Sequence, residues 1–207
     1  MRPDFRLYLI TDRRLFASSE EMMDAIEKAL QGGTRAVQLR EKDLAIRELL
    51  DLAYRMRELT ARYRARLFIN DRVDIALAVE ADGVHLGGMS MPAHAAQKAS
   101  AGRLMIGVSA HTMDEARTAQ EDGADFITLG PVYETPSKMQ YGRPIGIHVL
   151  HEAAGTLSVP AFAIGGIKTA RVKEVLQQGA FGIALISAIL KAEDVRKTTE
   201  EFMRELP

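Results

Sequence analysis

The sequence predicts an α/β protein folded as a single (β/α)8 TIM barrel with short loops over residues 1–207. Eight short apolar runs alternate strictly with amphipathic segments, which implies a parallel sheet, and eight such units are the number that closes a barrel. No G-x-G-x-x-G pattern follows the first run, which argues against the rival fold, an open doubly wound sheet. No Pro/Ser-rich linker divides the chain, so one domain is expected.

The apolar runs are too short for globular helices and suit strands that are buried on both faces. Several of them follow an acidic Ala-Asp corner or a glycine, which fits the left-handed residue that ends a helix. In chain order, the expected strands lie at 6–11, within 31–40, at 66–70, within 80–87, at 104–109, within 121–130, at 160–166 and within 178–187.

The amphipathic segments between these runs are the expected helices. The first opens on serine and acidic residues, and Thr112 stands before Asp114 and Glu115 in the same arrangement, as in capped helices. The expected helices lie at 19–31, 44–64, 72–79, 92–100, 112–121, 146–154, 169–177 and 193–205.

The composition is that of an ordinary globular protein, with 47% hydrophobic and 27% charged residues. Lys and Arg number 27 against 28 Asp and Glu, so the net charge is -1 and no global field attracts nucleic acid or an anionic membrane. The absence of cysteine excludes disulfides and thiolate metal sites. The N-terminus lacks a signal-peptide pattern and no apolar run reaches bilayer length, so a cytoplasmic protein without membrane or nucleic-acid partners is expected.

Polar residues collect where the expected strands end, which is where barrels of this class carry their active sites. Arg40 and Lys42 supply positive charge, and Asp71 offers oxygen to a hard cation such as Mg²⁺. The bare amides after Gly165-Gly166 can bind an anion. The neutral phosphate donors are Ser109, Thr135, Ser137 and Ser187. Two phosphate-recognising zones follow, one near the last two strands and one near Arg40, Asp71, Ser109 and Lys138, which indicates two phosphorylated substrates, or one substrate and a diphosphate leaving group.

Ordinary structural roles stay open for several of these residues. Asp71 could cap the following helix, Ser109 could cap the next one, and Gly165-Gly166 could form only a tight turn. His85 lies within an apolar run and is interpreted as a core histidine with satisfied hydrogen bonds.

Seven stretches, in order along the chain, resemble the thiamine phosphate synthase/thiazole tautomerase (TenI-like) family. They are "YLITD" (8–12), "VQLREKD" (37–43), "LFINDRVDIALAVEADGVHLG" (67–87), "IGVSAHTMDEA" (106–116), "GADFITLGPVYETPSK" (123–138), "AIGGI" (163–167) and "ALISAI" (184–189). The resemblance implies a (β/α)8 barrel and a Mg²⁺-dependent transferase, a thiamine-phosphate diphosphorylase. Such an enzyme couples aminopyrimidine methyl diphosphate to thiazole phosphate and releases pyrophosphate.

The resemblance also implies roles for individual residues. Asp71 would ligate Mg²⁺, and Ser109 and Lys138 would contact the diphosphate. The pyrimidine and its diphosphate would face Gln38, Arg40, Lys42 and Asn70. The thiazole phosphate would be held by Thr135, Ser137, Gly166, Ile186 and Ser187. The loop 135–144 is expected to be a mobile lid over the phosphorylated ligand, and a homo-oligomer stays open.

One departure from the synthase pattern leaves alternatives to the synthase, although the sixth expected strand keeps the synthase pattern. In "HLGGMSM", Ser90 stands where synthases carry a second Mg²⁺ carboxylate, which resembles the tautomerase branch. Position 131 is proline, as in synthases, where tautomerases carry a catalytic histidine. The alternatives are a thiazole phosphate tautomerase, with His111 transferring the proton, and a non-catalytic regulatory module that binds thiamine phosphate.

Overall fold

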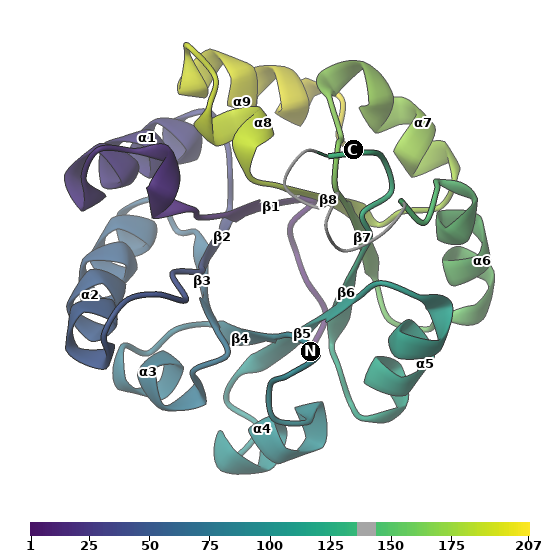
Figure 1. Ribbon diagram of the computed structural model, residues 1–207, viewed down its shortest axis with the longest axis horizontal. Helices are drawn as coiled ribbons and strands as arrows, with labels where there is room; N and C mark the ends of the chain where they lie inside the picture. The colour runs from purple at the N-terminus through teal and green to yellow at the C-terminus, as the bar shows by residue number, and fades with distance from the viewer. Residues whose placement is uncertain (136–143) are drawn as a thin grey trace.

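The computed structural model describes residues 1–135 and 144–207 and shows a closed barrel of eight parallel strands (Figure 1). The strands pair in sequence order, and β8 closes the ring by pairing with β1. Each strand overlaps one of the expected runs. Their bounds are β1 (Leu7–Ile10), β2 (Ala36–Leu39), β3 (Arg66–Asn70), β4 (Gly83–Leu86), β5 (Met105–Ala110), β6 (Phe126–Leu129), β7 (Ala161–Ile164) and β8 (Gly182–Leu185). The prediction of a (β/α)8 barrel is confirmed.

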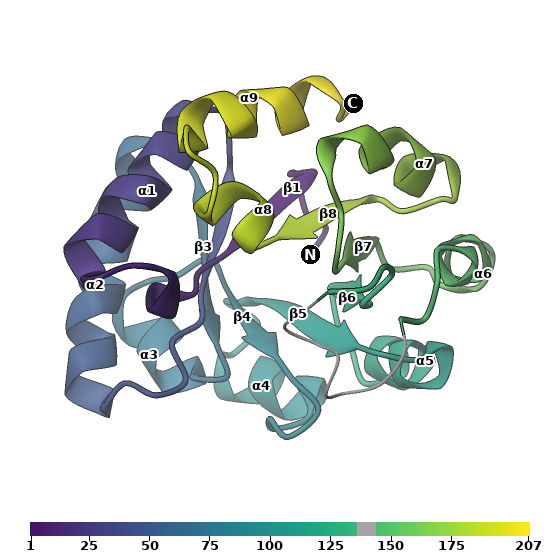
Figure 2. The ribbon, with the colours of Figure 1, turned by 45° about the horizontal axis from the view of Figure 1, so that its top comes forward.

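Helices surround the ring of strands on its outside (Figures 1 and 2). The eight expected helices appear as α1 (Ser19–Gln31), α2 (Ile46–Arg62), α3 (Val73–Ala78), α4 (Ala93–Ala99), α5 (Met113–Glu121), α6 (His148–Thr156), α7 (Val172–Gln177) and α9 (Val195–Arg204). Ser18 caps α1 and Thr112 caps α5 through their side chains, as the sequence indicates. The expected helix at 169–177 begins as the 3-10 turn η3 (Thr169–Arg171), and two short elements were not expected, namely η1 (Arg13–Leu15) and α8 (Ser187–Leu190). They are too short to carry a helical period in the sequence.

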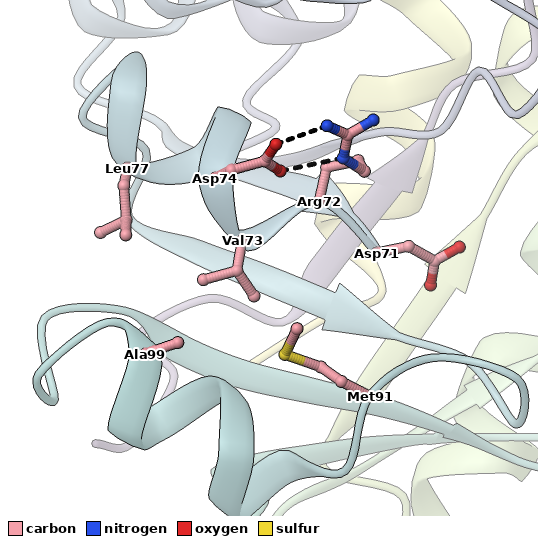
Figure 3. A pocket seen from close by; sticks show the side chains of 7 residues that line it. All are labelled: Asp71, Arg72, Val73, Asp74, Leu77, Met91 and Ala99. Atoms are coloured by element: carbon pink, nitrogen blue, oxygen red, sulfur yellow. Dashed lines mark hydrogen bonds and ion pairs between the residues drawn. The ribbon is translucent and has the colours of Figure 1, made fainter. Parts of the chain in front are cut away.

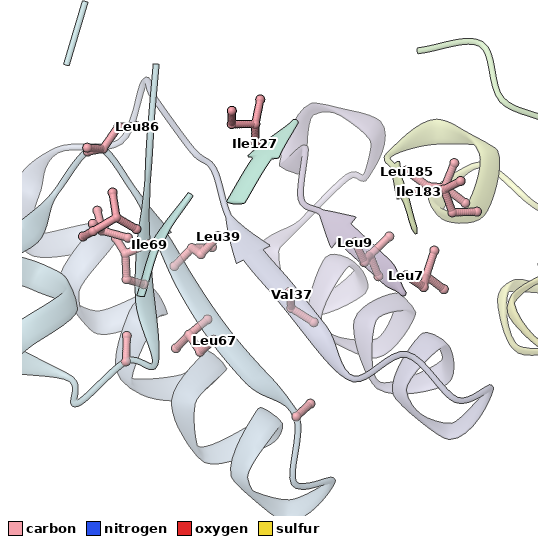
Figure 4. Close-up of a cluster of buried hydrophobic side chains, with 14 of the residues drawn as sticks. Leu7, Leu9, Val37, Leu39, Leu67, Ile69, Leu86, Ile127, Ile183 and Leu185 are labelled. Carbon is pink, nitrogen blue, oxygen red and sulfur yellow. The ribbon is translucent and has the colours of Figure 1, made fainter. Parts of the chain in front are cut away.

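The core has two layers, because successive side chains of a strand point to opposite faces. Outward-facing aliphatic residues such as Leu7, Leu9 and Val37 pack against the helices (Figure 4). Inward-facing residues fill the barrel with an aromatic plug, made of Phe5, Tyr8, Phe68, Phe126 and Phe162. Side chains therefore fill the interior of the barrel, and a ligand can approach that interior only from its ends.

Glycines in neighbouring strands make room for the plug. The cross-strand pairs are Phe68 with Gly83, Phe126 with Gly107, and Phe162 with Gly182. A Cβ at Gly83 would lie 2.4 Å from the Phe68 ring, and one at Gly107 would lie 2.4 Å from the Phe126 ring. Each large ring thus occupies the volume that its neighbour leaves, which is how cores reach native density.

Polar side chains replace the aromatic plug toward the carboxyl ends of the strands. Gln38, His85 and Thr128 are each at most 2% exposed, although all three are polar. Buried polar groups are normally held by hydrogen bonds, so this layer must be organised internally. None of the helices that the structure describes has the length and apolar character needed to cross a bilayer.

Candidate active site

The structure places every described candidate residue at the carboxyl end of the barrel. This end carries Gln38, Arg40 and Lys42 from β2, Asn70 and Asp71 from β3, Ser109 from β5, Gly166 from β7, and Ile186 and Ser187 from β8. Thr135 follows β6 and is partly buried. Ser137 and Lys138, with most of the expected lid, lie outside the described residues. The roles of all these residues stay predictions.

Asp71 is the centre of the first cluster. Asn70 Nδ2 donates to Asp71 Oδ2 at 2.7 Å, and Lys42 Nζ lies 3.6 Å from the same oxygen. The Ser90 hydroxyl donates to Asp71 Oδ1 and itself accepts a hydrogen bond from the Gly87 amide at 2.7 Å. Asp71 does not cap α3, whose N-cap is Arg72 without a side-chain bond. The Asp71 carboxylate is therefore held by two hydrogen-bond donors and one ion pair, and its backbone is in the left-handed conformation, with φ at 60°.

Ser90 preserves the position of Asp71 but contributes no negative charge. Within residues 1–135 and 144–207, no three His, Asp or Glu side chains gather as a metal site. Mg²⁺ commonly binds through one or two carboxylates and completes its shell with waters and substrate phosphate oxygens. The donor set of one carboxylate and one neighbouring hydroxyl fits an ion that is bound in this way.

Glu41, which stands between Arg40 and Lys42 in the sequence, is a buried acid whose hydrogen bonds fix the end of β2. Its side chain accepts hydrogen bonds from the Thr11 hydroxyl at 2.5 Å and from the Arg13 amide at 3.1 Å. The Thr11 oxygen in turn accepts from the Arg40 amide at 2.9 Å. Burial raises the pKa of Glu41, which is only 5% exposed, and the hydrogen bond from Thr11 opposes that shift. Sequence reasoning missed Glu41, although an acid within "LREKD" is the signal that could have found it.

The guanidinium of Arg40 makes no ion pair or hydrogen bond within the part of the chain that the structure describes. Arg40 is partly buried at the rim of the barrel, and Lys42 is exposed beside it. The hydrogen bond from Arg14 and, more weakly, the charge of Arg40 lower the pKa of Asp12, but within the described residues no direct contact of the Arg40 guanidinium has to break before it binds an anionic ligand. This arrangement suits a phosphate or diphosphate.

Beneath these charges lies the buried polar layer. His85 Nε2 lies 3.0 Å from Ser109 Oγ, and its Nδ1 lies 3.4 Å from the Tyr8 hydroxyl. Gln38 Nε2 donates to the Tyr8 oxygen at 3.1 Å. Burial lowers the pKa of His85 to about 3. The interpretation of His85 as a satisfied core histidine is confirmed, and Ser109 does not cap α5, because Thr112 does.

The second cluster is built where β7 and β8 end. Gly165 and Gly166 have φ values of 98° and 66°, and a Cβ on them would lie 2.6 Å from Pro131 and 2.7 Å from Tyr133. The segment after β6 thus packs directly on this glycine pair. Because Ile164 pairs with Ala184, the glycines lie beside the residues that follow β8. This geometry is compatible with both roles expected for Gly165-Gly166, a tight turn and a set of backbone amides that can bind an anion.

Arg171 and Tyr133 support this turn and were missed in the sequence. Arg171 donates to the Gly166 carbonyl at 3.0 Å and lies 4.1 Å from the centre of the Tyr133 ring. The Tyr133 hydroxyl donates to Glu174 at 2.9 Å. Burial, with the Glu174 carboxylate, raises the pKa of Tyr133 to about 12.

A shallow pocket of about 380 Å³ borders Asp71 on the helix side of the barrel (Figure 3). It lies between α3 and α4 and is lined by Asp71, Arg72, Val73, Asp74, Leu77, Met91 and Ala99. Arg72 and Asp74 are paired with each other inside it. His111, the proton-transfer residue of the tautomerase hypothesis, is exposed and lies 3.4 Å from Glu115.

Comparison with known proteins links this geometry to one family. The family model described as thiamine monophosphate synthase matches residues 7–189. A protein from Geobacter sulfurreducens is 53% identical over 204 residues, which cover 99% of this chain and 95% of that protein. Thiamine-phosphate synthase from Pyrococcus furiosus is 43% identical, over 99% of this chain and 96% of its own length. The solved structure of thiamine phosphate pyrophosphorylase from Pyrococcus furiosus superposes with a TM-score of 0.88 at 42% identity, over 97% of this chain and 95% of that one.

Proposed function

Because this chain belongs to the thiamine monophosphate synthase family, we propose that it is a thiamine-phosphate synthase, an enzyme that joins aminopyrimidine methyl diphosphate to thiazole phosphate and releases pyrophosphate. The observation that carries the proposal is Arg40 at the barrel mouth, which makes no ion pair or hydrogen bond through its guanidinium among the described residues, with Lys42 after the same strand and Ser109 on β5 at the same end of the barrel. These groups supply what a departing diphosphate requires, namely fixed positive charge and hydrogen-bond donors.

The reaction needs charge stabilisation more than it needs proton transfer. The bond between the pyrimidine methylene carbon and the diphosphate oxygen breaks, and the electron pair leaves with the diphosphate. The ring's amino group shares the positive charge that remains on carbon, and the lone pair of the thiazole nitrogen then forms the new carbon–nitrogen bond. Arg40 and Lys42 stabilise the leaving group, and no general base of the protein is required.

Mg²⁺ is the cofactor that we assign to this site, with Asp71 as its protein ligand. When bound, the ion would neutralise charge on the diphosphate. Asn70, Lys42 and Ser90 keep the Asp71 carboxylate in place through the contacts described above. Since the chain offers one carboxylate here, we expect the substrate's own oxygens to complete the metal shell.

We assign the thiazole phosphate to the second cluster. Gly166, Ile186 and Ser187 lie side by side after β7 and β8, which is the common phosphate site of these barrels. Thr135 approaches from the segment after β6, and Ser137 and Lys138 belong to the same stretch outside the described residues. Gln38 is assigned to the pyrimidine side, although its amide nitrogen is engaged with Tyr8.

One observation favours a second candidate, a regulatory module that binds thiamine phosphate without turnover. Ser90 removes a charge from the metal site and satisfies Asp71 with a hydrogen bond instead. The tautomerase alternative has less support, because position 131 is proline and His111 is exposed and engaged with Glu115.

A two-substrate assay tests the synthase. Wild-type protein with both substrates and Mg²⁺ should release pyrophosphate and thiamine phosphate in equal amounts. Ser90→Asp restores an acid and should lower the Mg²⁺ concentration for half-maximal rate by about tenfold, with Ser90→Asn as the neutral control of similar size. If neither wild type nor Ser90→Asp releases pyrophosphate while calorimetry shows tight binding of thiamine phosphate, the protein is the regulatory module.

A further inference from the structure

Five polar side chains form one connected row through the buried layer of the barrel. Gln38 Nε2 donates to the Tyr8 oxygen at 3.1 Å, and the Tyr8 hydroxyl lies 3.4 Å from His85 Nδ1. His85 Nε2 lies 3.0 Å from Ser109 Oγ and 3.4 Å from Thr128 Oγ1, and the Thr128 hydroxyl donates to Ser109 Oγ at 3.3 Å. The row starts inside the barrel and ends on Ser109, which is partly open to the mouth.

The Gln38 end of the row determines which nitrogen of His85 carries the proton. Tyr8 is fully buried, and burial raises its pKa well above the usual value, so the phenol keeps its single proton. Gln38 Nε2 can only donate to the Tyr8 oxygen, and among the described residues His85 Nδ1 is the acceptor beside the buried phenol, so the phenol proton is assigned to Nδ1. A neutral imidazole that accepts at Nδ1 carries its hydrogen on Nε2. His85 is 2% exposed, and such burial favours the neutral ring over the charged one.

The hydrogen on Nε2 then determines what Ser109 can do. A hydroxyl has two acceptor sites and one proton. The Ser109 oxygen receives one hydrogen bond from His85 and one from Thr128, both from inside the barrel. Its acceptor sites are therefore filled, and its own proton is the part left for a ligand at the mouth.

We propose that His85 is a positioning residue, which acts through its Nε2–H to make Ser109 a hydrogen-bond donor toward the departing diphosphate. This inference rests on the proposed synthase activity for its consequence in catalysis, although the hydrogen-bond directions stand on their own. A serine that can only donate is suited to an anion whose charge grows as the bond breaks. Such a hydroxyl gains strength in the transition state and should affect kcat more than KM.

The first test measures the tautomer of His85 and needs no substrate. A long-range ¹H–¹⁵N correlation spectrum of the labelled protein should show His85 with hydrogen on Nε2 and none on Nδ1 between pH 6 and 8, and a His85→Gln spectrum assigns the signal. Tyr8→Phe removes the donor to Nδ1 and should shift the tautomer equilibrium. Hydrogen on Nδ1, or a charged ring in that range, would overturn the proposal.

The second test separates orientation from folding. Ser109→Ala should lower kcat on the order of 100-fold, and His85→Leu about tenfold, with KM changed less than threefold in each. His85→Gln places an amide donor near the position of Nε2 and should recover most of the loss. In a Ser109→Ala background, His85→Leu should have no further effect, because both act through one hydroxyl. Equal losses in His85→Leu and His85→Gln, or additive losses in the double variant, would contradict the mechanism.

A third measurement keeps this proposal separate from the synthase assignment. If no variant turns over, the assignment of activity fails, and calorimetry with inorganic pyrophosphate and Mg²⁺ still tests the row. His85→Leu should then weaken pyrophosphate binding severalfold and His85→Gln should restore it. Unchanged affinity in His85→Leu would overturn the role of His85. If His85→Leu does not fold, the spectrum of Tyr8→Phe and the kinetics of His85→Gln test the role of His85 instead.

Discussion

The two ends of the barrel use charged residues in opposite ways. At the amino ends of the strands, Arg66 pairs with Asp4 at 2.9 Å and with Asp82 at 3.0 Å, and Arg57 reaches Asp82 at 2.6 Å. At the carboxyl ends, Arg40 has no such partner within the residues that the structure describes. The comparison shows that the arginines at the amino end hold the strands together, whereas Arg40 at the carboxyl end is left for a ligand.

The amino end also shows how a repeated sequence feature stabilises the barrel. Asp82 and Asp125 both follow an alanine just before a strand, at the acidic corners noted in the sequence. Asp82 accepts from the Leu67 amide at 2.9 Å, and Asp125 accepts from the Ile106 amide at 2.8 Å. Each acid thus satisfies a backbone donor at the start of the preceding strand, which has no ladder partner there.

The largest expected effect comes from Arg40 at the carboxyl end. Arg40→Ala should lower kcat/KM by about 10²–10³-fold, because it removes charge that stabilises the leaving diphosphate. Its melting temperature should change by less than about 2 °C, since the guanidinium makes no ion pair or hydrogen bond with residues 1–135 and 144–207. Steady-state kinetics and thermal unfolding measure the two quantities.

Arg66→Ala is the matched control from the amino end. It should lower stability and leave kcat/KM unchanged, because its partners Asp4 and Asp82 are far from the barrel mouth. If Arg40→Ala destabilised the protein as much as Arg66→Ala and kept full activity, the contrast between the two ends would be refuted.

A smaller effect is expected when an acidic corner is removed. Asp82→Ala should lower the free energy of unfolding by about 1–3 kcal/mol, because the Leu67 amide and two arginines lose their acceptor. Urea unfolding measures the change. Asp43→Ala, which removes an exposed partner of Arg13, should cost less than about 1 kcal/mol. Equal costs in the two variants would mean that the corner has no special role.

The smallest effect concerns the pH dependence of the amino end. The hydrogen bond from Arg66 holds the pKa of Asp4 below its usual 3.8, so the folded state binds this proton less readily than the unfolded state. The stabilisation is complete above pH 3.8 and is lost as the pH falls through the lowered pKa. Asp4→Asn should therefore cost a few tenths of a kcal/mol near pH 7, and the cost should shrink below about pH 3.8. A cost that is unchanged in acid would show that the ion pair is not its source.

Most of the barrel could be predicted from the sequence, because its signal is local. A short apolar run, a glycine or acid at the corner and a capped amphipathic segment each report on a few adjacent residues, and all eight units were found in this way. The fit of Phe68 beside Gly83 could not be predicted, since it depends on the register between two strands. The four-residue helix α8 also gave no period to detect.

The sequence predicted where the candidate site lies in the barrel, but it predicted fewer of the contacts between the site residues. Residues after the strands could be assigned to one rim because parallel strands end together, and Arg40, Asp71 and Ser109 do lie there. The hydrogen bond from Ser90 to Asp71 and the buried position of Glu41 depend on how loops fold back, which a single sequence does not encode locally. The roles given to Ser137 and Lys138 stay predictions.

The central claim is that the anion and its metal bind at the carboxyl end of the barrel alone. Paramagnetic broadening of amide signals by Mn²⁺ with pyrophosphate, used in place of Mg²⁺, tests it most directly. The account predicts that the signals of Arg40, Lys42, Asp71 and Ser109 broaden first, while those of Asp82 and Asp125 stay sharp. Broadening centred on Asp82 and Asp125, or spread evenly over both ends, would contradict it.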